Sequence, residues 1–146
     1  MKIDNDSVQV YLSAIAFRFT YLAKDLPSNF ANFEAGQGVK TPLEILRHMT
    51  AVLNFAYQQF ENIEEPKPKE LDWQGESARF LQKLKDLDQS LANGAKFSNK
   101  LMQVENLWQG PLVDVMTHIG QLAMLRRLAG SPLEGMKYWK AAVYKF

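Results

Sequence analysis

Apolar residues recur every three or four positions in four long stretches of this chain, and prolines or glycines separate the stretches. This period matches one face of an α-helix. The stretches are residues 7–24, 42–62, 72–92 and 110–129. Helices of roughly 18 to 22 residues fit an up-and-down four-helix bundle, so we predict an all-α fold. Loop length leaves the topology open, because the connections after the first and third helices exceed the shortest bundle turns.

Residues typical of helix ends support these boundaries. Ser7 is a plausible N-cap for the first helix. Thr41, Pro42 and Glu44 have the order of a capping box, with proline at the first helical position. The pair at 93–94, Asn-Gly, is expected to end the third helix.

The last helix and the segments between helices carry similar signals. Gly130 is suited to a left-handed cap after the last helix, and Pro132 follows it. Pro66 and Pro68 mark an exposed linker between the second and third helices. Residues 96–109 have a weaker pattern, which we interpret as a short helix or an irregular turn.

The length of 146 residues favours a single domain, 1–146, with enough chain to bury a core. Residues after 130 form a C-terminal extension, which we expect to pack through its aromatic side chains. On the third helix, four charged residues are expected to face water: Glu76, Lys83, Lys85 and Asp86.

Composition narrows the classes of function. A formal charge of +1 gives no electrostatic basis for nucleic-acid binding. No apolar run is long enough to cross a membrane, and the polar N-terminus is unlike a secretory signal. The chain has no cysteine, so disulfides and thiolate ligands are excluded. We therefore expect a soluble cytoplasmic protein.

The chain has two histidines, His48 and His118, and each lies on the apolar side of a predicted helix. Asp114 precedes His118 by four residues, so the two side chains project from one helical face. A carboxylate that faces a core is costly unless something compensates it. Imidazole nitrogen and carboxylate oxygen are both ligands for zinc, nickel and related ions. We therefore interpret His48, Asp114 and His118 as a divalent-metal site.

A second interpretation needs no metal. Both histidines can be core residues with hydrogen-bond partners, and Asp114 lies near the expected start of its helix, where a carboxylate is favourable. The spacing alone leaves the two interpretations about equally supported.

Other residues are weaker candidates for the site. Gln121 can contact a ligand histidine from outside the coordination sphere, or simply pack between helices. Arg47 and Arg126 can orient an anionic substrate, although such residues are more often solvated. Tyr57 can line a pocket, although aromatic residues at helical spacing are usually core.

The piece from Gly110 to Leu122, GPLVDVMTHIGQL, with LRRLAG at 125–130, resembles the fourth helix of the DinB/YfiT-like superfamily. The piece at 41–48, TPLEILRH, is similar to its second helix. The order of four helices and the total length also match.

The resemblance implies a four-helix bundle of the DinB/YfiT-like type that binds a divalent metal, commonly nickel or zinc. His48 and His118 take the positions of two metal histidines. Asp114 stands where the family commonly has a third histidine, which is a departure, although aspartate is a competent ligand.

The resemblance further implies an enzyme that acts on a small-molecule substrate. The activities it suggests are transfer or isomerisation dependent on a low-molecular-weight thiol, and metal-dependent hydrolysis. It also implies a homodimer. A non-catalytic bundle that binds a small ligand or a partner chain stays open as an alternative.

Overall fold

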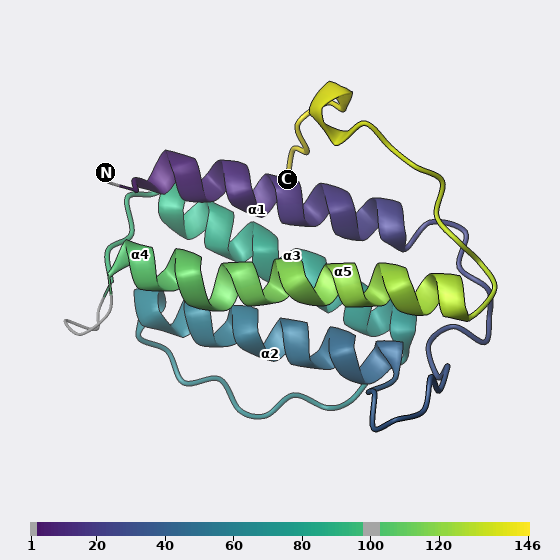
Figure 1. The fold of residues 1–146 in the computed structure, drawn as a ribbon. Coiled ribbons are helices and arrows are strands. Elements are labelled where there is room, and N and C mark those ends of the chain that lie inside the picture. Colours follow the sequence, from purple (N-terminus) through teal and green to yellow (C-terminus); the bar gives the residue numbers. More distant parts are fainter. Residues whose placement is uncertain (1–2, 98–102) are drawn as a thin grey trace.

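The computed structural model describes residues 3–97 and 103–146, and within them the regular structure is entirely helical. Four long helices form a bundle, as predicted (Figure 1). The predicted segment at 96–109 becomes helical from residue 104, while its residues 98–102 lie outside the described part. The elements are α1 (Asn5–Leu22), α2 (Pro42–Glu61), α3 (Trp73–Ala92), α4 (Val104–Leu107), η1 (Trp108–Leu112), α5 (Val113–Leu128) and η2 (Tyr138–Lys140).

Helices α2 and α3 run in the same direction. Arg47 and Glu76, near their N-terminal ends, approach to 3.5 Å. At their C-terminal ends, the hydroxyl of Ser90 donates to Glu61 at 2.6 Å. The linker at 62–72 therefore returns along the length of the bundle before α3 begins (Figure 1).

Helices α1 and α5 run opposite to α2 and α3. Asn5, at the start of α1, donates to the carbonyl of Leu91 at the end of α3. Arg126, at the end of α5, donates to the carbonyl of Leu22 at the end of α1. The topology is thus up-down-down-up. The predicted up-and-down order is wrong at α3, because the long linker lets consecutive helices lie parallel.

The helix caps largely follow the sequence signals. The capping box is present: Glu44 N–H donates to Thr41 Oγ1 at 3.3 Å, and Thr41 N–H donates to Glu44 Oε2 at 2.7 Å. Asn93 and Gly130 occupy the expected C-terminal positions. Ser7 is not the N-cap of α1, because Asp4 takes that position and accepts from the Ser7 N–H.

Helix α5 does not begin at Pro111. Helical backbone starts at Val104 and continues through a π-helical turn, η1, into α5 without a break (Figure 1). Proline has no N–H and its ring clashes with the preceding turn, and a wider turn accommodates this. The π-turn ends at Leu112, so Asp114 lies directly beyond it.

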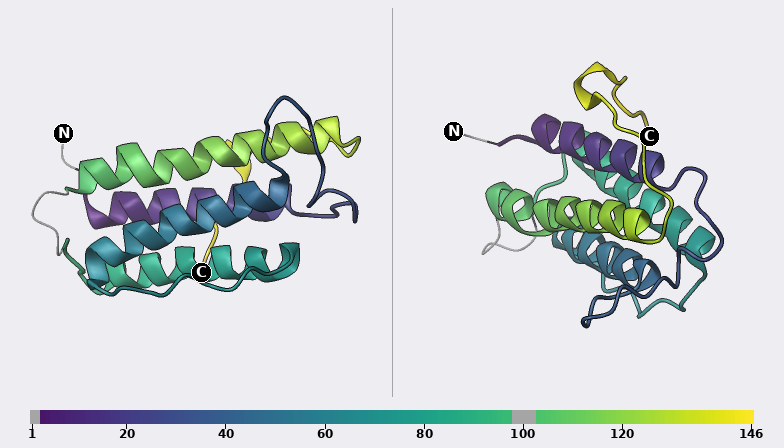
Figure 2. Two further views of the ribbon diagram at one scale, coloured as in Figure 1. Left: turned by 90° about the horizontal axis from the view of Figure 1, so that it is seen from below. Right: turned by 45° about the vertical axis from the view of Figure 1, so that its right-hand side comes forward.

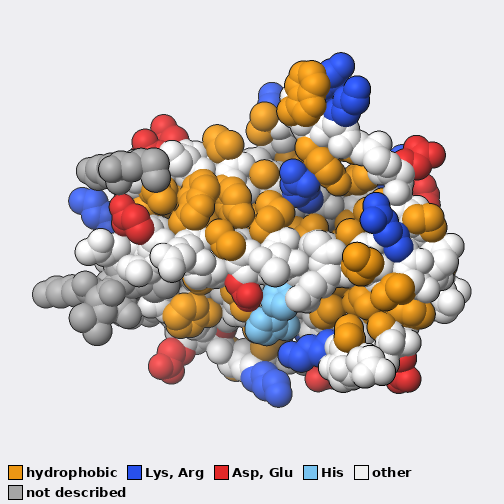
Figure 3. Space-filling model, in the orientation of Figure 1, with side chains coloured by type: hydrophobic (Ala, Val, Ile, Leu, Met, Phe, Trp, Pro, Cys, Tyr) orange, Lys and Arg blue, Asp and Glu red, His pale blue; other side chains and the backbone are white. Residues whose placement is uncertain are grey.

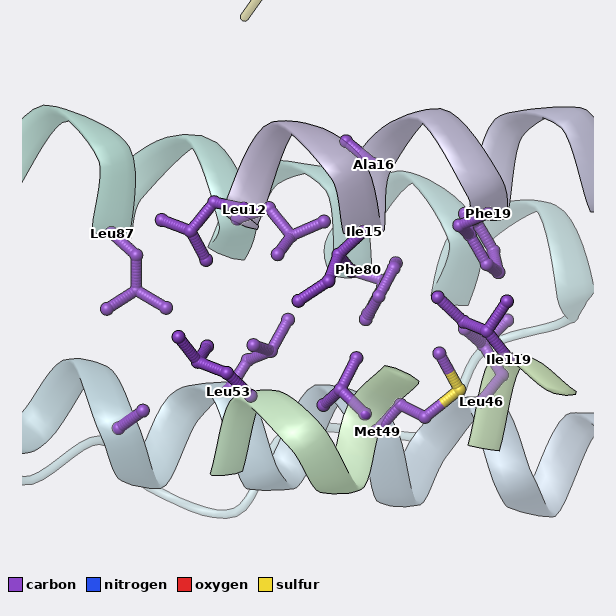
Figure 4. Close-up of a cluster of buried hydrophobic side chains, with 14 of the residues drawn as sticks. Leu12, Ile15, Ala16, Phe19, Leu46, Met49, Leu53, Phe80, Leu87 and Ile119 are labelled. Atoms are coloured by element: carbon purple, nitrogen blue, oxygen red, sulfur yellow. The ribbon is translucent and has the colours of Figure 1, made fainter. Parts of the chain in front are cut away.

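All four long helices contribute to one core (Figure 4). Phe19, Phe80, Leu53 and Ile119 come from different helices and meet there. Helix α1 packs against α3 and α5, and α2 packs against the same two helices. Helices α2 and α5 are therefore neighbours, which brings residues about 70 positions apart side by side.

Two charged residues of α3 are buried, contrary to the prediction that they face water. Glu76 is 2% exposed and Lys83 is 9% exposed. Arg79 compensates Glu76 at 3.1 Å, and Glu65 compensates Lys83 at 3.1 Å. Lys85 is exposed as expected.

The C-terminal extension crosses back over α1 (Figure 2). The guanidinium of Arg18 lies 3.8 Å from the centre of the Tyr138 ring, and Tyr21 donates to the carbonyl of Glu134. Trp139 is 80% exposed, so the expected aromatic packing holds only in part. None of the helices in the described ranges combines the length and the apolar character that a membrane span needs.

Candidate metal centre

The structure brings His48, Asp114 and His118 together. His48 is on α2, while Asp114 and His118 lie one turn apart on α5. Asp114 Oδ2 lies 3.5 Å from Nε2 of His48 and 3.5 Å from Nε2 of His118. The two imidazole rings meet nearly edge to face, with their centres 4.8 Å apart. One carboxylate oxygen is thus equidistant from two ring nitrogens of different helices.

The cluster lies at the surface and not in the bundle interior, which corrects the prediction. The side chains of His48 and Asp114 are 41% and 46% exposed, and that of His118 is 18% exposed. Histidine atoms are visible on the surface beside an acidic side chain in Figure 3. On α2 the buried face is set by Leu46, Met49 and Leu53, roughly a third of a turn from the side that carries His48.

The start of a helix does not explain the position of Asp114. Helical backbone begins at Val104, so the free N–H groups of the helix N-terminus lie more than two turns before Asp114. Favourable interaction with a helix dipole falls off within the first turn. The nearest charged or titratable partners of this carboxylate are therefore the two imidazoles.

Gln121 fixes the orientation of one imidazole. Its Oε1 lies 2.8 Å from Nδ1 of His118. The amide oxygen can only accept, so the tautomer that makes this hydrogen bond carries its proton on Nδ1 and its lone pair on Nε2. Metal-binding histidines are oriented in this manner by a partner on the second ring nitrogen. Of the two predicted positions for Gln121, contact with His118 or packing between helices, the structure shows the contact.

The distances between donor atoms suit a small divalent ion. A tetrahedral ion with bonds of about 2.0–2.1 Å keeps its ligands about 3.3–3.4 Å apart. Both nitrogen–oxygen distances are 3.5 Å, and all three ligand atoms lie within 4.8 Å of one another. A side-chain movement of about 1.5 Å or less closes the widest separation to the tetrahedral value. The donor set of two nitrogens and one oxygen fits zinc and nickel alike.

A shallow groove adjoins the cluster. It has a volume of about 440 Å³, and Asp114 is part of its wall together with Val52, Pro111, Val113 and Thr117. The π-turn forms one side of the groove and α2 forms the other. A small molecule in this groove has direct access to the carboxylate of Asp114.

Arg47 and Tyr57 do not join the cluster. Arg47 donates to the carbonyl of Leu71 at 2.7 Å and pairs with Glu70 and Glu76, which directs it toward α3. Tyr57 lies nine residues after His48, on the opposite side of α2. Its ring contacts the ammonium of Lys83. The pKa of Tyr57 is raised by burial and by nearby acidic groups, Glu61 first among them.

Arg126 has a structural position that the sequence analysis missed. Its side chain is buried and donates to the carbonyls of Leu22, Lys24, Asp25 and Ser131. It therefore joins the ends of α1 and α5 and is not available to an anionic substrate.

The burial of Glu76 and Lys83 also has a signal in the sequence. Each precedes a core residue, Phe80 or Leu87, by four positions, so each lies on the apolar face of α3.

Comparisons with protein-family models, curated proteins and solved structures find no match for this chain.

Proposed function

We propose that this chain is a metal-dependent enzyme that binds one divalent ion, zinc or nickel, through His48, Asp114 and His118. The observation that carries the proposal is the position of Asp114 Oδ2, 3.5 Å from Nε2 of each histidine. Helices α2 and α5 together bring three ligand atoms to within 4.8 Å of one another. Gln121 strengthens the case, because it holds the second nitrogen of His118 and leaves Nε2 free.

The placement of the site favours a catalytic over a structural ion. Structural zinc sites are closed by four protein ligands, whereas catalytic sites have three and keep a position open. Here three protein groups converge, and both His48 and Asp114 are more than two-fifths exposed. A divalent ion in this position supplies Lewis acidity, which lowers the pKa of a bound thiol or water molecule.

The reaction we propose is transfer or isomerisation dependent on a low-molecular-weight thiol. The resemblance to the DinB/YfiT-like superfamily supports this choice. The residues are compatible with it, because both histidines of the chain are ligands and no imidazole remains as general base. A thiol has less need of a base than water, since its ordinary pKa is about 8.5. The groove beside Asp114 provides space for the small-molecule partner.

Metal content tests the proposed site directly. Protein purified without a metal-affinity tag is incubated with zinc, nickel or manganese, desalted, and measured by elemental analysis. We expect about one ion per chain for the natural sequence, and a loss of at least tenfold in affinity for His48→Ala and His118→Ala. Gln89→Ala, an exposed substitution on α3, is the matched control. Substoichiometric metal after every addition would contradict the site.

Cobalt substitution tests the thiol. Addition of glutathione or cysteine to the cobalt-loaded protein is expected to produce a sulfur-to-cobalt charge-transfer band, which His118→Ala abolishes. S-methylcysteine, which cannot form a thiolate, is the control and should give no band. Hydrolysis of a panel of simple esters without any response to thiols would instead support the hydrolytic alternative.

A further inference from the structure

The linker between α2 and α3 is held against the bundle at two places, and we name residues 63–71 the strap. At its first part, Glu65 pairs with Lys83 at 3.1 Å. At its far end, Arg79 donates to the carbonyl of Lys69 at 2.9 Å, and Arg47 donates to the carbonyl of Leu71 at 2.7 Å. The strap is therefore fastened at both ends and passes over the groove between the two parallel helices.

Glu76 organises the far anchor. This carboxylate accepts from the guanidinium of Arg79 at 3.1 and 3.2 Å and from the N–H of Leu71 at 2.9 Å. It is only 2% exposed, so these partners replace the water that it loses. Burial of a carboxylate under a loop is expensive, and the network shows that the position of the strap is defined by specific contacts.

A cavity of about 520 Å³ lies between the strap and the two helices. Small-molecule sites commonly have volumes of about 300–1,000 Å³. Ala51 and Phe55 of α2 and Pro66 and Pro68 of the strap supply apolar wall. None of the lining residues belongs to the His48, Asp114 and His118 cluster, so this is a separate site.

The charges around the cavity balance one another. Its lining includes four basic and four acidic side chains. Most of them form ion pairs, such as Arg47 with Glu70 and Lys83 with Glu65, which join a helix to the strap. An ionic ligand would have to compete with these pairs, whereas a neutral ligand would not.

Two buried polar atoms on residues of the wall make no hydrogen bond within the described ranges, Nε of Arg47 and Oδ1 of Asn54, and of these Nε of Arg47 has a charged partner, Glu76, at 3.5 Å. Oδ1 of Asn54 is buried and accepts no hydrogen bond within the described ranges. Buried polar atoms are nearly always satisfied, and an exception calls for an explanation. Once the Asn54 side chain turns Oδ1 toward the cavity, a ligand with an N–H or O–H group there would supply the missing donor.

We propose that the cavity beneath the strap binds an uncharged, largely apolar small molecule whose N–H or O–H group donates to Asn54. The volume, the apolar wall, the paired charges and the unsatisfied oxygen point to the same ligand chemistry. This site is independent of the metal centre and adds a second small-molecule site to the chain.

Indole and benzofuran are suitable probes, because they have nearly the same size and shape but only indole carries a donor. Both are titrated into ¹⁵N-labelled full-length protein and followed by amide chemical shifts. We expect saturable shifts confined to residues around the cavity, with indole binding roughly fivefold more tightly than benzofuran. The Asn54→Leu variant should remove the preference for indole.

Ala51→Trp fills the cavity and should abolish binding of both probes. Ala51 is exposed on α2, and Ala92→Trp, also at an exposed alanine, is the control that should leave binding intact. The His118→Ala variant should bind indole normally, so failure of the metal site and failure of this site are distinguishable. Shifts that do not saturate, or that persist in a folded Ala51→Trp protein, would overturn the proposal.

Discussion

Oε1 of Gln121 lies 2.8 Å from Nδ1 of His118, one turn along the same helix. Of the two nitrogens of this ring, Nδ1 is engaged by the amide and Nε2 faces Asp114. Gln121, which is not one of the three clustered residues, thus helps to set how the His118 ring is oriented toward Asp114. Gln121 is itself exposed, so its contribution to folding is small while its contribution to the site is specific.

Gln121→Ala should therefore weaken metal binding without unfolding the protein. We expect a loss of about tenfold to a hundredfold in zinc affinity, because the imidazole of His118 is no longer oriented. Competition with a fluorescent zinc chelator measures the effect, and Gln89→Ala serves as the control. Unchanged affinity in Gln121→Ala would show that the amide plays no part in the site.

Two substitutions at Asp114 distinguish the effect of its charge on metal affinity from its role as a metal ligand. Asp114→Asn keeps the shape of the side chain but removes its charge, and we expect at least tenfold weaker binding by calorimetry. Asp114→His restores an imidazole ligand at that position and should bind the ion more tightly than the asparagine variant. Equal affinities for the two variants would argue against coordination by this residue.

In the absence of metal, neither Asp114 substitution should change stability much. The side chain is 46% exposed, and its contacts with the two imidazoles, at 3.5 Å each, lie at the surface. Such pairs contribute about 0–1 kcal/mol. Urea unfolding of the metal-free proteins checks this expectation, and a much larger loss would indicate a structural role for the cluster.

The helices could be predicted from sequence because their signals are local. The capping box formed by Thr41 and Glu44 depends on residues three positions apart, and it is present as predicted. The direction of α3 could not be predicted, because it depends on how the strap is anchored. Those anchors, such as Arg79 with the carbonyl of Lys69, join segments whose proximity exists only in the folded chain.

The residues that form the cluster could also be predicted, whereas the extent to which they are buried could not. The i, i+4 spacing of Asp114 and His118 fixes their common face, and the cluster with His48 is present. His48, however, is predicted on the apolar side of its helix, whereas its side chain is 41% exposed and Phe55, two turns further along the same side of α2, is 51% exposed. Periodicity shows that a helix has an apolar side, but neighbouring helices decide which edge of that side is covered.

The capping box makes one contribution to stability dependent on pH. The pKa of Glu44 is lowered, first by the backbone N–H of Thr41 and then by its hydroxyl. Because the folded pKa lies below the unfolded one, the stabilisation is complete above the ordinary glutamate pKa and is lost as the pH falls through the folded value.

Glu44→Gln should therefore reduce stability near neutral pH, and the difference from the natural protein should shrink on acidification. Unfolding free energies measured from about pH 6 to about pH 3 test this. Glu34→Gln, at an exposed loop position, is the control and should show no such trend. A difference that is constant across the whole range would contradict the assignment.

Arg126 should be among the most sensitive positions for stability. Its buried guanidinium donates to carbonyls at the end of α1 and to the carbonyl of Ser131. Arg126→Met keeps the aliphatic bulk but leaves these carbonyls without a donor, and we expect a loss of about 3 kcal/mol in unfolding free energy. Arg127→Met, at the exposed neighbouring position, should change it by no more than about 0.5 kcal/mol.

Glu76→Gln tests whether the strap and the bundle are coupled through one carboxylate. The substitution keeps a hydrogen-bond acceptor for Leu71 but leaves the guanidinium of Arg79 without its charged partner. We expect a loss of about 3 kcal/mol, because breaking a buried pair leaves a charge uncompensated. A protease that cuts after lysine can cleave the strap at Lys69, and this cleavage should accelerate by more than the loss of global stability alone predicts. Glu105→Gln, at an exposed site on α4, is the control, and equal cleavage rates in the two variants would show that Glu76 does not hold the strap.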